Sequence, residues 1–444
     1  MSPRSMFLKY IPKGWRSDRM GNVANILFSN VDKHTFDFEI PVRLCNYVDV
    51  YKNDRITSDI EFMEASAEPR EIARFQLQKG DVLATKDSES PDDIAIPSLV
   101  AETLPGVLCG YHLALIRPRV HQVYGPYLAW LHCSKAFRSH YEAQAVGVTR
   151  FGLSQAVFKE ARVPLPPLPE QQRIAAYLDT SCAAIDAAVA AKCRQLETLD
   201  AVRESIVETA ITRGMAAQPK LRLIDQDWIG SLPGHWTGTR IKQVTARMDY
   251  GISVSSEREG RFPVLKMGNI QAGEIMFSKI EFVDEVSDEL LLQTNDLLYN
   301  RTNSPDQVGK AALFRGTKDD AVTFASYLVR LRFNHRVIPE FMNYAVNCGG
   351  FLAFARRLAV PSVQQSNLNS TRYGRMLVPL PPLTEQRAIC EYLANKVGDL
   401  KRVVTTIEFQ ITTLTAYRQS LIHECVTGQR RITDADLNRV AAHG

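Results

Sequence analysis

The stretch VPLPPLPEQQRIAAYLD at residues 163–179 decides how this chain is organised, because residues 378–394 repeat it as VPLPPLTEQRAICEYLA. Aligned without a gap, residues 163–213 and 378–428 are identical at 19 of 51 positions. An internal repeat of this length indicates a duplicated structural unit. We therefore predict a pseudo-twofold chain in which a globular block followed by a helical stretch occurs twice.

Each copy contains a helix stop followed by a helix start. Three closely spaced prolines, at 164, 166 and 167 or at 379, 381 and 382, hold the chain extended because each ring fixes φ. Glu170 and Glu385 then place a negative charge at the positive end of a helix dipole. No proline follows before residue 213 or 428. Each copy therefore predicts a helix of roughly 44 residues, about 65 Å long.

Apolar residues recur in both helices with a period of seven. The first helix carries the line Leu178, Ile185, Lys192, Leu199 and Ile206. The second helix carries the line Leu393, Leu400, Ile407, Leu414 and Leu421. A second line runs beside each one at the spacing of a coiled-coil seam. We expect the helices to form an antiparallel coiled coil; the alternative is two ordinary core helices of separate domains.

Charged residues interrupt this seam at Lys192, Arg203 and Arg418. Because a buried charge without a partner is costly, we expect acidic neighbours across the seam. If the two helices overlap over their full length, Arg418 lies opposite Asp179. These positions test the pairing most directly.

Composition is that of a soluble globular protein with a chain of 444 residues, long enough for two or three domains. No segment resembles a signal peptide, and we expect none to approach membrane-spanning length. The 8 cysteines lack metal-binding spacing, which favours a reducing cytoplasm. A net charge of +4 permits binding to nucleic acid without arguing for it.

The large blocks show short apolar alternations bounded by Gly, Pro and Asn, which is typical of an α+β fold. They share phrases: IPKGW (11–15) returns as LPGHW (232–236), and FQLQKGDVLATKDSESPDD resembles LLQTNDLLYNRTNSPDQ. We predict five segments, namely a first globular domain at 1–162, a proline stop and helix at 163–213, a connector and second domain at 214–377, a second stop and helix at 378–428, and a poorly ordered tail at 429–444.

A search for catalytic motifs finds none. The dinucleotide-binding fingerprint, the P-loop and the tetrapeptide of amino-group methylation are missing, and no metal-binding spacing occurs. A nuclease-like acidic-x-Lys triple occurs at residues 399–401, where the middle of a helix makes a solvated face the simpler interpretation. The sequence therefore argues against an enzyme.

Several polar runs carry side chains suited to the edges of DNA bases. A cation follows a predicted strand at Lys86 and again at Arg301. The candidate DNA-contacting residues are Lys86, Arg150, Asn300, Arg301, Asn303, Arg330, Arg332, Gln364 and Gln365. The alternative for the runs is a turn satisfied by its own side chains. The alternative for the two strand arginines is a covered sheet face.

The doubled VPLPPLPEQQR and VPLPPLTEQRAI, with DQDWIGSLPGHW and NDLLYNRTNSPDQVGK, resemble the DNA specificity subunit of type I restriction-modification systems. The resemblance covers essentially the whole chain. It implies that each block is a target recognition domain reading one half of a bipartite, asymmetric site in double-stranded DNA. The helices would separate the domains, by about 19 base pairs at most for 65 Å of helix, and their heptad residues would dock partners.

The resemblance also implies which partners and cofactors to expect. Two methyltransferase subunits would carry S-adenosylmethionine, and two restriction subunits with ATP and Mg²⁺ could join them; the chain itself would hold no cofactor and contact no membrane. One alternative is a specificity protein of a related DNA-modification defence complex. An alternative of a different class is a coiled-coil scaffold that binds only protein.

Overall fold

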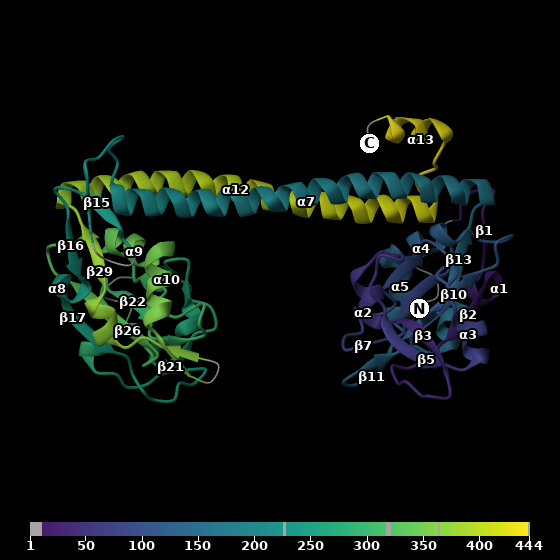
Figure 1. Ribbon diagram of the computed structural model, residues 1–444, viewed down its shortest axis with the longest axis horizontal. Coiled ribbons are helices and arrows are strands. Elements are labelled where there is room, and N and C mark those ends of the chain that lie inside the picture. The colour runs from purple at the N-terminus through teal and green to yellow at the C-terminus, as the bar shows by residue number, and fades with distance from the viewer. Residues whose placement is uncertain (1–10, 225–227, 317–320, 363–364, 443–444) are drawn as a thin grey trace. The chain divides into compact units, whose positions relative to one another are not determined.

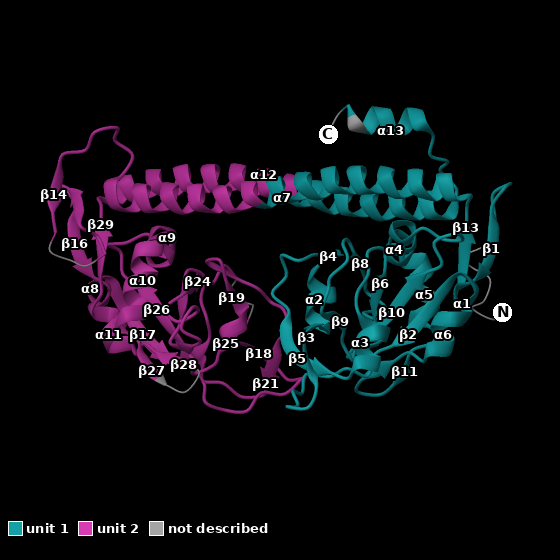
Figure 2. Ribbon diagram, turned by 45° about the vertical axis from the view of Figure 1, so that its right-hand side comes forward, with its two compact units in different colours: residues 1–193, 408–444 teal, residues 194–407 magenta. Residues whose placement is uncertain are grey.

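The computed structural model describes residues 11–224, 228–316, 321–362 and 365–442. The chain divides into two compact units (Figure 2): unit 1 comprises residues 1–193 and 408–444, and unit 2 comprises residues 194–407. Each unit contains one large block together with part of each long helix.

Two long helices follow the proline runs (Figure 1), α7 at Leu168–Arg213 and α12 at Leu383–Thr427. Each ends at a glycine with positive φ, Gly214 at 74° and Gly428 at 74°, the backbone conformation that terminates helices without a steric penalty. The predicted stop, start and length of both helices are confirmed.

Unit 1 is built around a five-stranded sheet in the order β2-β10-β6-β8-β4, with three-stranded sheets β5-β3-β9 and β11-β12-β7 and the pair β1-β13. Its strands are β1 (Arg16–Arg19), β2 (Ala24–Phe28), β3 (Ile40–Cys45), β4 (Arg55–Ile56), β5 (Met63–Ala67), β6 (Val82–Thr85), β7 (Asp87–Ser88), β8 (Pro97–Val100), β9 (Val107–Cys109), β10 (Leu113–Pro118), β11 (Val146–Gly147), β12 (Phe151–Gly152) and β13 (Arg162–Leu165). Its shorter helices are α1 (Met20–Val23), α2 (Tyr47–Lys52), α3 (Pro69–Phe75), α4 (Gly125–Cys133), α5 (Lys135–Glu142), α6 (Gln155–Glu160) and α13 (Asp434–Ala441).

Unit 2 contains a six-stranded sheet in the order β17-β26-β22-β24-β20-β19, with the sheets β21-β18-β25 and β23-β28-β27 and the pairs β14-β15 and β16-β29. Its strands are β14 (Leu221–Leu223), β15 (Ser231–Pro233), β16 (Thr237–Arg240), β17 (Thr245–Tyr250), β18 (Phe262–Leu265), β19 (Ile270–Gln271), β20 (Glu274–Ile275), β21 (Glu281–Val283), β22 (Leu297–Asn300), β23 (Thr302–Asn303), β24 (Ala311–Leu313), β25 (Thr323–Phe324), β26 (Leu328–Phe333), β27 (Val360–Ser362), β28 (Gln365–Asn367) and β29 (Leu377–Leu380). Its shorter helices are α8 (Ile241–Val244), η2 (Met267–Asn269), η3 (Asp288–Leu290), α9 (Pro339–Asn347), α10 (Gly349–Leu358) and α11 (Ser370–Arg375). The predicted α+β class is confirmed.

The Glu-Gln pair after each proline run holds the helix start onto the globular block of its own unit. In unit 1 the Trp15 indole N–H donates to Glu170 at 3.2 Å, and in unit 2 the Trp236 indole N–H donates to Glu385 at 3.0 Å. The neighbouring glutamine, Gln171, accepts from the Tyr124 amide at 2.8 Å and donates to two carbonyl oxygens. The repeated sequence motifs therefore form the same contact in both units, between the globular block and the start of its long helix.

A buried ion pair also recurs in the two blocks. Arg117 makes two parallel hydrogen bonds to Asp81, at 2.9 and 2.7 Å, and Arg332 makes the same two bonds to Asp296, both at 2.7 Å. Each aspartate is almost fully buried just before the strand that leads to the polar turn. The repeat is therefore structural as well as sequential.

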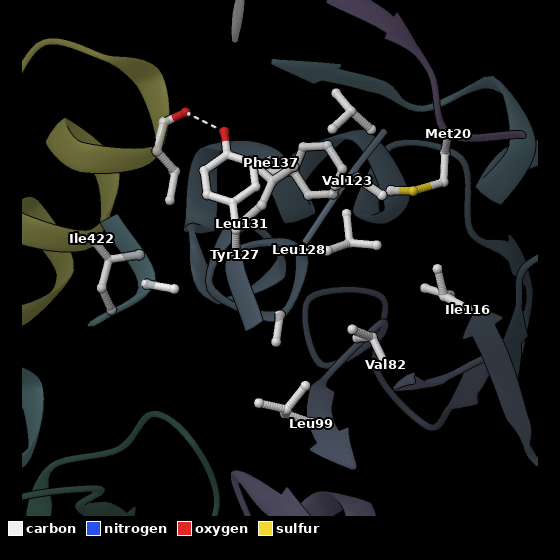
Figure 3. Close-up of a cluster of buried hydrophobic side chains, with 14 of the residues drawn as sticks. Met20, Val82, Leu99, Ile116, Val123, Tyr127, Leu128, Leu131, Phe137 and Ile422 are labelled. Atoms are coloured by element: carbon white, nitrogen blue, oxygen red, sulfur yellow. Dashed lines mark hydrogen bonds between the residues drawn. The ribbon is translucent and has the colours of Figure 1, made fainter. Parts of the chain in front are cut away.

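The core of unit 1 joins the long helices to the block (Figure 3). Tyr127 and Leu128 of α4 are buried in the same cluster as Ile422 of α12 and Leu178 of α7. The Tyr127 hydroxyl donates to the Pro164 carbonyl at 2.9 Å. The heptad residues therefore serve two interfaces near the globular block, the partner helix and the block itself.

The register of the coiled coil differs from the prediction by one heptad. Arg418 pairs with Asp186 at 2.9 Å, and its Nη2 also lies 3.5 Å from an Asp54 carboxylate oxygen. Asp179 pairs instead with Arg55. The prediction of Asp179 opposite Arg418 is wrong, because it assumed full overlap. The chain leaves α12 at Thr427, so the first turns of α7 contact other segments instead.

The acidic partner predicted across the seam exists for Arg418 but not for the other two charges. Lys192 donates to Gln410 at 2.6 Å, a neutral side chain. Arg203 lies 3.8 Å from Asp200 of its own helix and is 41% exposed. These two charges reach solvent at the edge of the seam, so they do not need a buried counter-charge.

The sequence-based expectation about membrane-spanning segments needs correction. Helix α7 is long and apolar enough to cross a membrane by length and composition alone, which is weak evidence for a single helix. Its Leu178, Cys182 and Ile185 are buried in the core of unit 1, and Asp186 pairs with Arg418. Those contacts are typical of a core helix in a globular unit.

The tail is more ordered than predicted. Arg431 pairs with Glu170 at 2.7 Å, and Ile432 is buried in the core of unit 1. Thr433 then caps α13 by accepting a hydrogen bond from the Asp436 amide. The expectation overlooked these anchors, which lie between the polar residues.

Candidate nucleic-acid interface

In each unit a small three-stranded sheet gathers the predicted contact residues from distant parts of the sequence. In unit 1, β7 pairs with β12 so that Gly152 lies opposite Asp87, which places the turn carrying Arg150 beside Lys86. In unit 2, β23 pairs with β28 so that Asn367 lies opposite Thr302, which places Gln365 beside the Arg301 turn. The same register in both units makes the two sites equivalent by the internal repeat.

The unit 1 cation is held between two aromatic rings. The Lys86 ammonium lies 5.0 Å from the ring centroid of Phe28 and 4.3 Å from that of Tyr111. Half-burial lowers the pKa of Lys86 from its ordinary value. The rings position the charge at the end of β6, so the side chain loses little freedom when it binds an anion or a base edge.

Arg150 is exposed and held by a carboxylate that it shares with a histidine. Its guanidinium bonds to Asp87 at 2.5 Å, and the His112 ring nitrogen bonds to the other oxygen of Asp87 at 2.9 Å. Asp87 is largely buried, so it orients both groups from below. Within the part of the chain that the structure describes, no hydrogen bond engages Nη1 of Arg150, so this group can donate to a bound ligand.

The unit 2 cation repeats this geometry with different residues. The Arg301 guanidinium lies 5.0 Å from the ring centroid of Tyr250, and its Nη1 donates to the Ser326 carbonyl at 3.2 Å. The Tyr250 hydroxyl shares a 2.8 Å hydrogen bond with the Ser370 hydroxyl, which fixes the ring. Tyr250 occupies the strand position that Phe28 occupies in unit 1. Phe28 lies opposite Ala114 of β10, Tyr250 lies opposite Val329 of β26, and β10 and β26 each pair with the strand that ends just before the cation.

The other predicted residues of unit 2 vary in exposure. Gln365 is exposed on β28, and Asn303 is half-buried, with its side-chain oxygen accepting from the Ser304 amide at 2.8 Å. Asn303 therefore follows the self-satisfied turn that was the alternative interpretation. Gln364 lies outside the described residues.

Burial removes two candidates from the predicted contact residues. Arg330 is fully buried, bonds to Asp249 at 2.5 Å and donates to two carbonyl oxygens of the unit 2 block. Asn300 is 1% exposed at the end of β22. The prediction of DNA contact for these two residues is wrong, because strand pairing turns them inward. The Arg332 side chain is 28% exposed and pairs with Asp296, so its contact with DNA stays a prediction.

The aromatic residues of both sites were not among the predicted contact residues. Phe28, Tyr111 and Tyr250 are distant in sequence from the cations that they hold. The available signal was the alternation of exposed aromatics with basic residues, but it becomes informative only when the strands are paired. Among the described residues, no group of three or more His, Cys, Asp or Glu side chains could hold a metal ion.

The predicted spacer residues lie along α7 and α12 with graded burial. Four are buried in the cores of their units, namely Leu178, Ile185, Leu393 and Leu421. Ile407 is also buried, outside those cores. Four are half-buried, namely Leu199, Ile206, Leu400 and Leu414. Most of the buried seam residues therefore lie where a helix also packs against its globular block.

Comparison with known proteins supports this architecture. Residues 12–197 match the family model described as Type I restriction modification DNA specificity domain. The whole chain resembles the EcoKI specificity subunit of Escherichia coli strain K12, with 22% identity over 94% of this chain and 90% of that one. The family model thus covers part of the chain, and the relatives that match nearly all of it are type I restriction enzyme specificity subunits.

Other type I specificity subunits are similar to this chain over different lengths. The StySPI specificity subunit of Salmonella potsdam is 22% identical over 94% of this chain and 90% of that one. The putative MjaX specificity subunit of Methanocaldococcus jannaschii is 24% identical over 45% of this chain and 47% of that one. The family model ends within α7, so the full-length relatives carry the assignment of the second half.

Two solved structures share the fold of this chain. A chain solved in a study of complex assembly and conformational transition of the type I R-M system has a TM-score of 0.72 at 17% identity, over 94% of this chain and 98% of that one. The HsdS subunit from Thermoanaerobacter tengcongensis has a TM-score of 0.51 at 17% identity, over 95% of this chain and 98% of that one.

Proposed function

We propose that this chain is a non-catalytic subunit that recognises DNA in a type I restriction-modification complex. Each unit reads one half of a bipartite, asymmetric site in double-stranded DNA. The observation that carries the proposal is the repeated cation over an aromatic ring, Lys86 over Phe28 and Arg301 over Tyr250. Arginine and lysine are the usual partners of guanine in the major groove, and a fixed side chain discriminates better than a mobile one.

The partners are two methyltransferase subunits, which bind S-adenosylmethionine, and two restriction subunits, which use ATP and Mg²⁺. The exposed aromatic residues Phe409 and Tyr417, 70% and 50% exposed on the unit 1 part of α12, offer contact area for a partner. Assembly on chromosomal DNA places the complex in the cytoplasm.

The test compares substitutions in the two units within the assembled methyltransferase. Lys86→Ala should relax or abolish recognition of one half-site, and Arg301→Ala should do the same for the other, each costing about 1–3 kcal/mol at the affected base. Arg402→Ala is the control, because that exposed arginine pairs with Asp399 on α12 and belongs to neither turn. Methylome sequencing reads both half-sites at once. A uniform loss across all sequences would contradict base reading by these residues.

The helices set the spacing between half-sites in this proposal. Removing one heptad from both α7 and α12 should shorten the spacer in the methylated sequence and leave the half-site bases unchanged. Changed half-site bases would contradict a ruler function for the helices.

Two other functions remain distinguishable by experiment. A specificity protein of a related DNA-modification complex would methylate DNA with a different set of partner subunits. A protein-binding scaffold would show no sequence-dependent electrophoretic shift of DNA when the methyltransferase is present. The DNA-facing cations favour the restriction-modification subunit over the scaffold.

A further inference from the structure

We propose that unit 1 contains a binding groove for a nucleobase that has left the DNA stack. The inference rests on the proposed function, because the base would come from the half-site that unit 1 reads. The aromatic groove, as we call it, is a cavity of about 420 Å³ next to the Lys86 turn. The residues that define it are His34, Asn46, Tyr47, Met63, Tyr111 and His112.

The groove presents aromatic faces to solvent. Tyr111 is 50% exposed, and Tyr47 stacks on Tyr51 with ring centroids 5.6 Å apart and planes 15° apart. Exposed rings beside basic groups are the usual platform for bases that are not stacked in a duplex, since each base adds about 1–3 kcal/mol by stacking. Duplex DNA offers base edges to a protein and hides the base faces. The rings of this groove therefore suit a base only after it leaves the stack.

One wall of the groove is shared with the DNA-facing sheet. His112 lines the groove and bonds to Asp87, which in turn holds Arg150. Tyr111 also forms one side of the Lys86 site. A DNA strand bound at Lys86 and Arg150 therefore lies against the mouth of the groove.

The groove also offers polar groups for a base edge. The Asn46 side-chain amide lies 3.6 Å from the Met63 sulfur, a weak acceptor, so its N–H groups can donate to a carbonyl or ring nitrogen of a base. Lys33 lines the same cavity beside Asp32, so its ammonium can attract a phosphate of an extruded nucleotide while the neighbouring carboxylate limits the net charge of this wall. Stacking, edge bonding and phosphate attraction thus converge at one place.

The equivalent region of unit 2 is built differently. The cavity beside Arg301 has a volume of about 340 Å³ and is lined by Tyr250, Gly251, Ser253, Arg301, Ser326 and Asn369. It is lined by one tyrosine, which lies against the Arg301 guanidinium, whereas the unit 1 groove has Tyr47 in addition to the tyrosine that lies against Lys86. We therefore expect base capture at the half-site of unit 1 and not at the half-site of unit 2.

The test uses the chain assembled with its methyltransferase and duplexes that carry both half-sites. A mismatch is moved through the unit 1 half-site one position at a time, because a mismatched base costs less to extrude. At one position the wild-type complex should bind the mismatched duplex about tenfold more tightly than the matched duplex. Tyr47→Ala and Tyr111→Ala should lose that gain, and Tyr47→Phe should keep it because the ring remains. Phe38→Ala is the control, since Phe38 is 82% exposed and does not line the groove.

The outcomes separate this inference from the proposed function. If no position in the unit 1 half-site shows the gain, or if both alanine variants keep it, the groove does not bind a base. If the alanine variants weaken matched and mismatched duplexes equally, the tyrosines serve duplex binding or a protein contact, and the inference is also wrong. If the wild-type complex shows no sequence-specific binding to matched DNA, the proposed function itself fails. Permanganate oxidation of thymines reports independently whether a base is unstacked.

Discussion

Replacing Gln171 by methionine should destabilise unit 1 by about 3 kcal/mol, at about 1 kcal/mol for each hydrogen bond lost. Gln171 is fully buried and makes three such bonds: it accepts from the Tyr124 amide at 2.8 Å and donates to the Pro166 and Gln122 carbonyls at 2.8 and 3.3 Å. Methionine keeps the length of the side chain but pairs with none of these groups. The lost hydrogen bonds are therefore those that connect the proline run with the segment just before α4.

The assay combines urea unfolding with hydrogen exchange. The neighbouring Gln172 is exposed, so Gln172→Met is a matched control that should change stability by less than about 0.5 kcal/mol. The Tyr124 amide should lose protection in Gln171→Met. In unit 2, Gln386 accepts from the Ile338 amide at 2.7 Å, so Gln386→Met should expose that amide instead. Equal stability of Gln171→Met and Gln172→Met, or loss of protection at Ile338 in Gln171→Met, would refute the reasoning.

Further expectations concern buried charges and pH. Arg330→Met should destabilise unit 2 by about 3–5 kcal/mol, because Asp249 and two backbone carbonyl oxygens lose the hydrogen bonds that the buried guanidinium donates, while the folded fraction keeps its DNA affinity; weaker DNA binding at unchanged stability would contradict the burial of Arg330. A double-mutant cycle between Arg418 and Asp186, measured by urea unfolding, should give a coupling of about 1 kcal/mol, whereas the pair Arg418 and Asp179 should give none. Burial lowers the pKa of His132 from 6.5 to about 4. The unfolded chain therefore takes up a proton first as pH falls, so stability present above pH 6.5 should decline towards pH 4, by up to about 3 kcal/mol; His132→Gln should flatten that decline, and an unchanged pH profile of the unfolding free energy would contradict it.

The long helices and the two polar turns were predictable because their signals are local. Proline geometry, a seven-residue apolar period and a cation after a strand each depend on neighbours in the sequence. The coiled-coil register was not predictable to better than a heptad, because a seven-residue period repeats the same seam at every shift. In the structure α12 ends at Thr427, and Arg418 pairs with Asp186, one heptad from Asp179.

The candidate site was predictable only in part, because the burial of its residues depends on contacts between segments distant in sequence. Lys86 and Arg301 could be identified from the repeat, whereas the burial of Arg330 and Asn300 depended on which strands lie beside them. Alternation along a strand shows that neighbouring side chains face opposite ways, but it does not show which face is covered. The hydrophobic core covers the face that carries Arg330, which then pairs with Asp249.

The sequence by itself determined the repeat, the helices that begin after VPLPPL, the α+β class and the absence of familiar catalytic motifs. These follow from local backbone preferences and from self-comparison. The tertiary structure decided which cations face outward, which aromatic rings hold them and which acid meets Arg418. Those outcomes depend on contacts between residues far apart in the chain, such as Tyr127 with Pro164 or Lys86 with Phe28, which form only when the strands and helices pack.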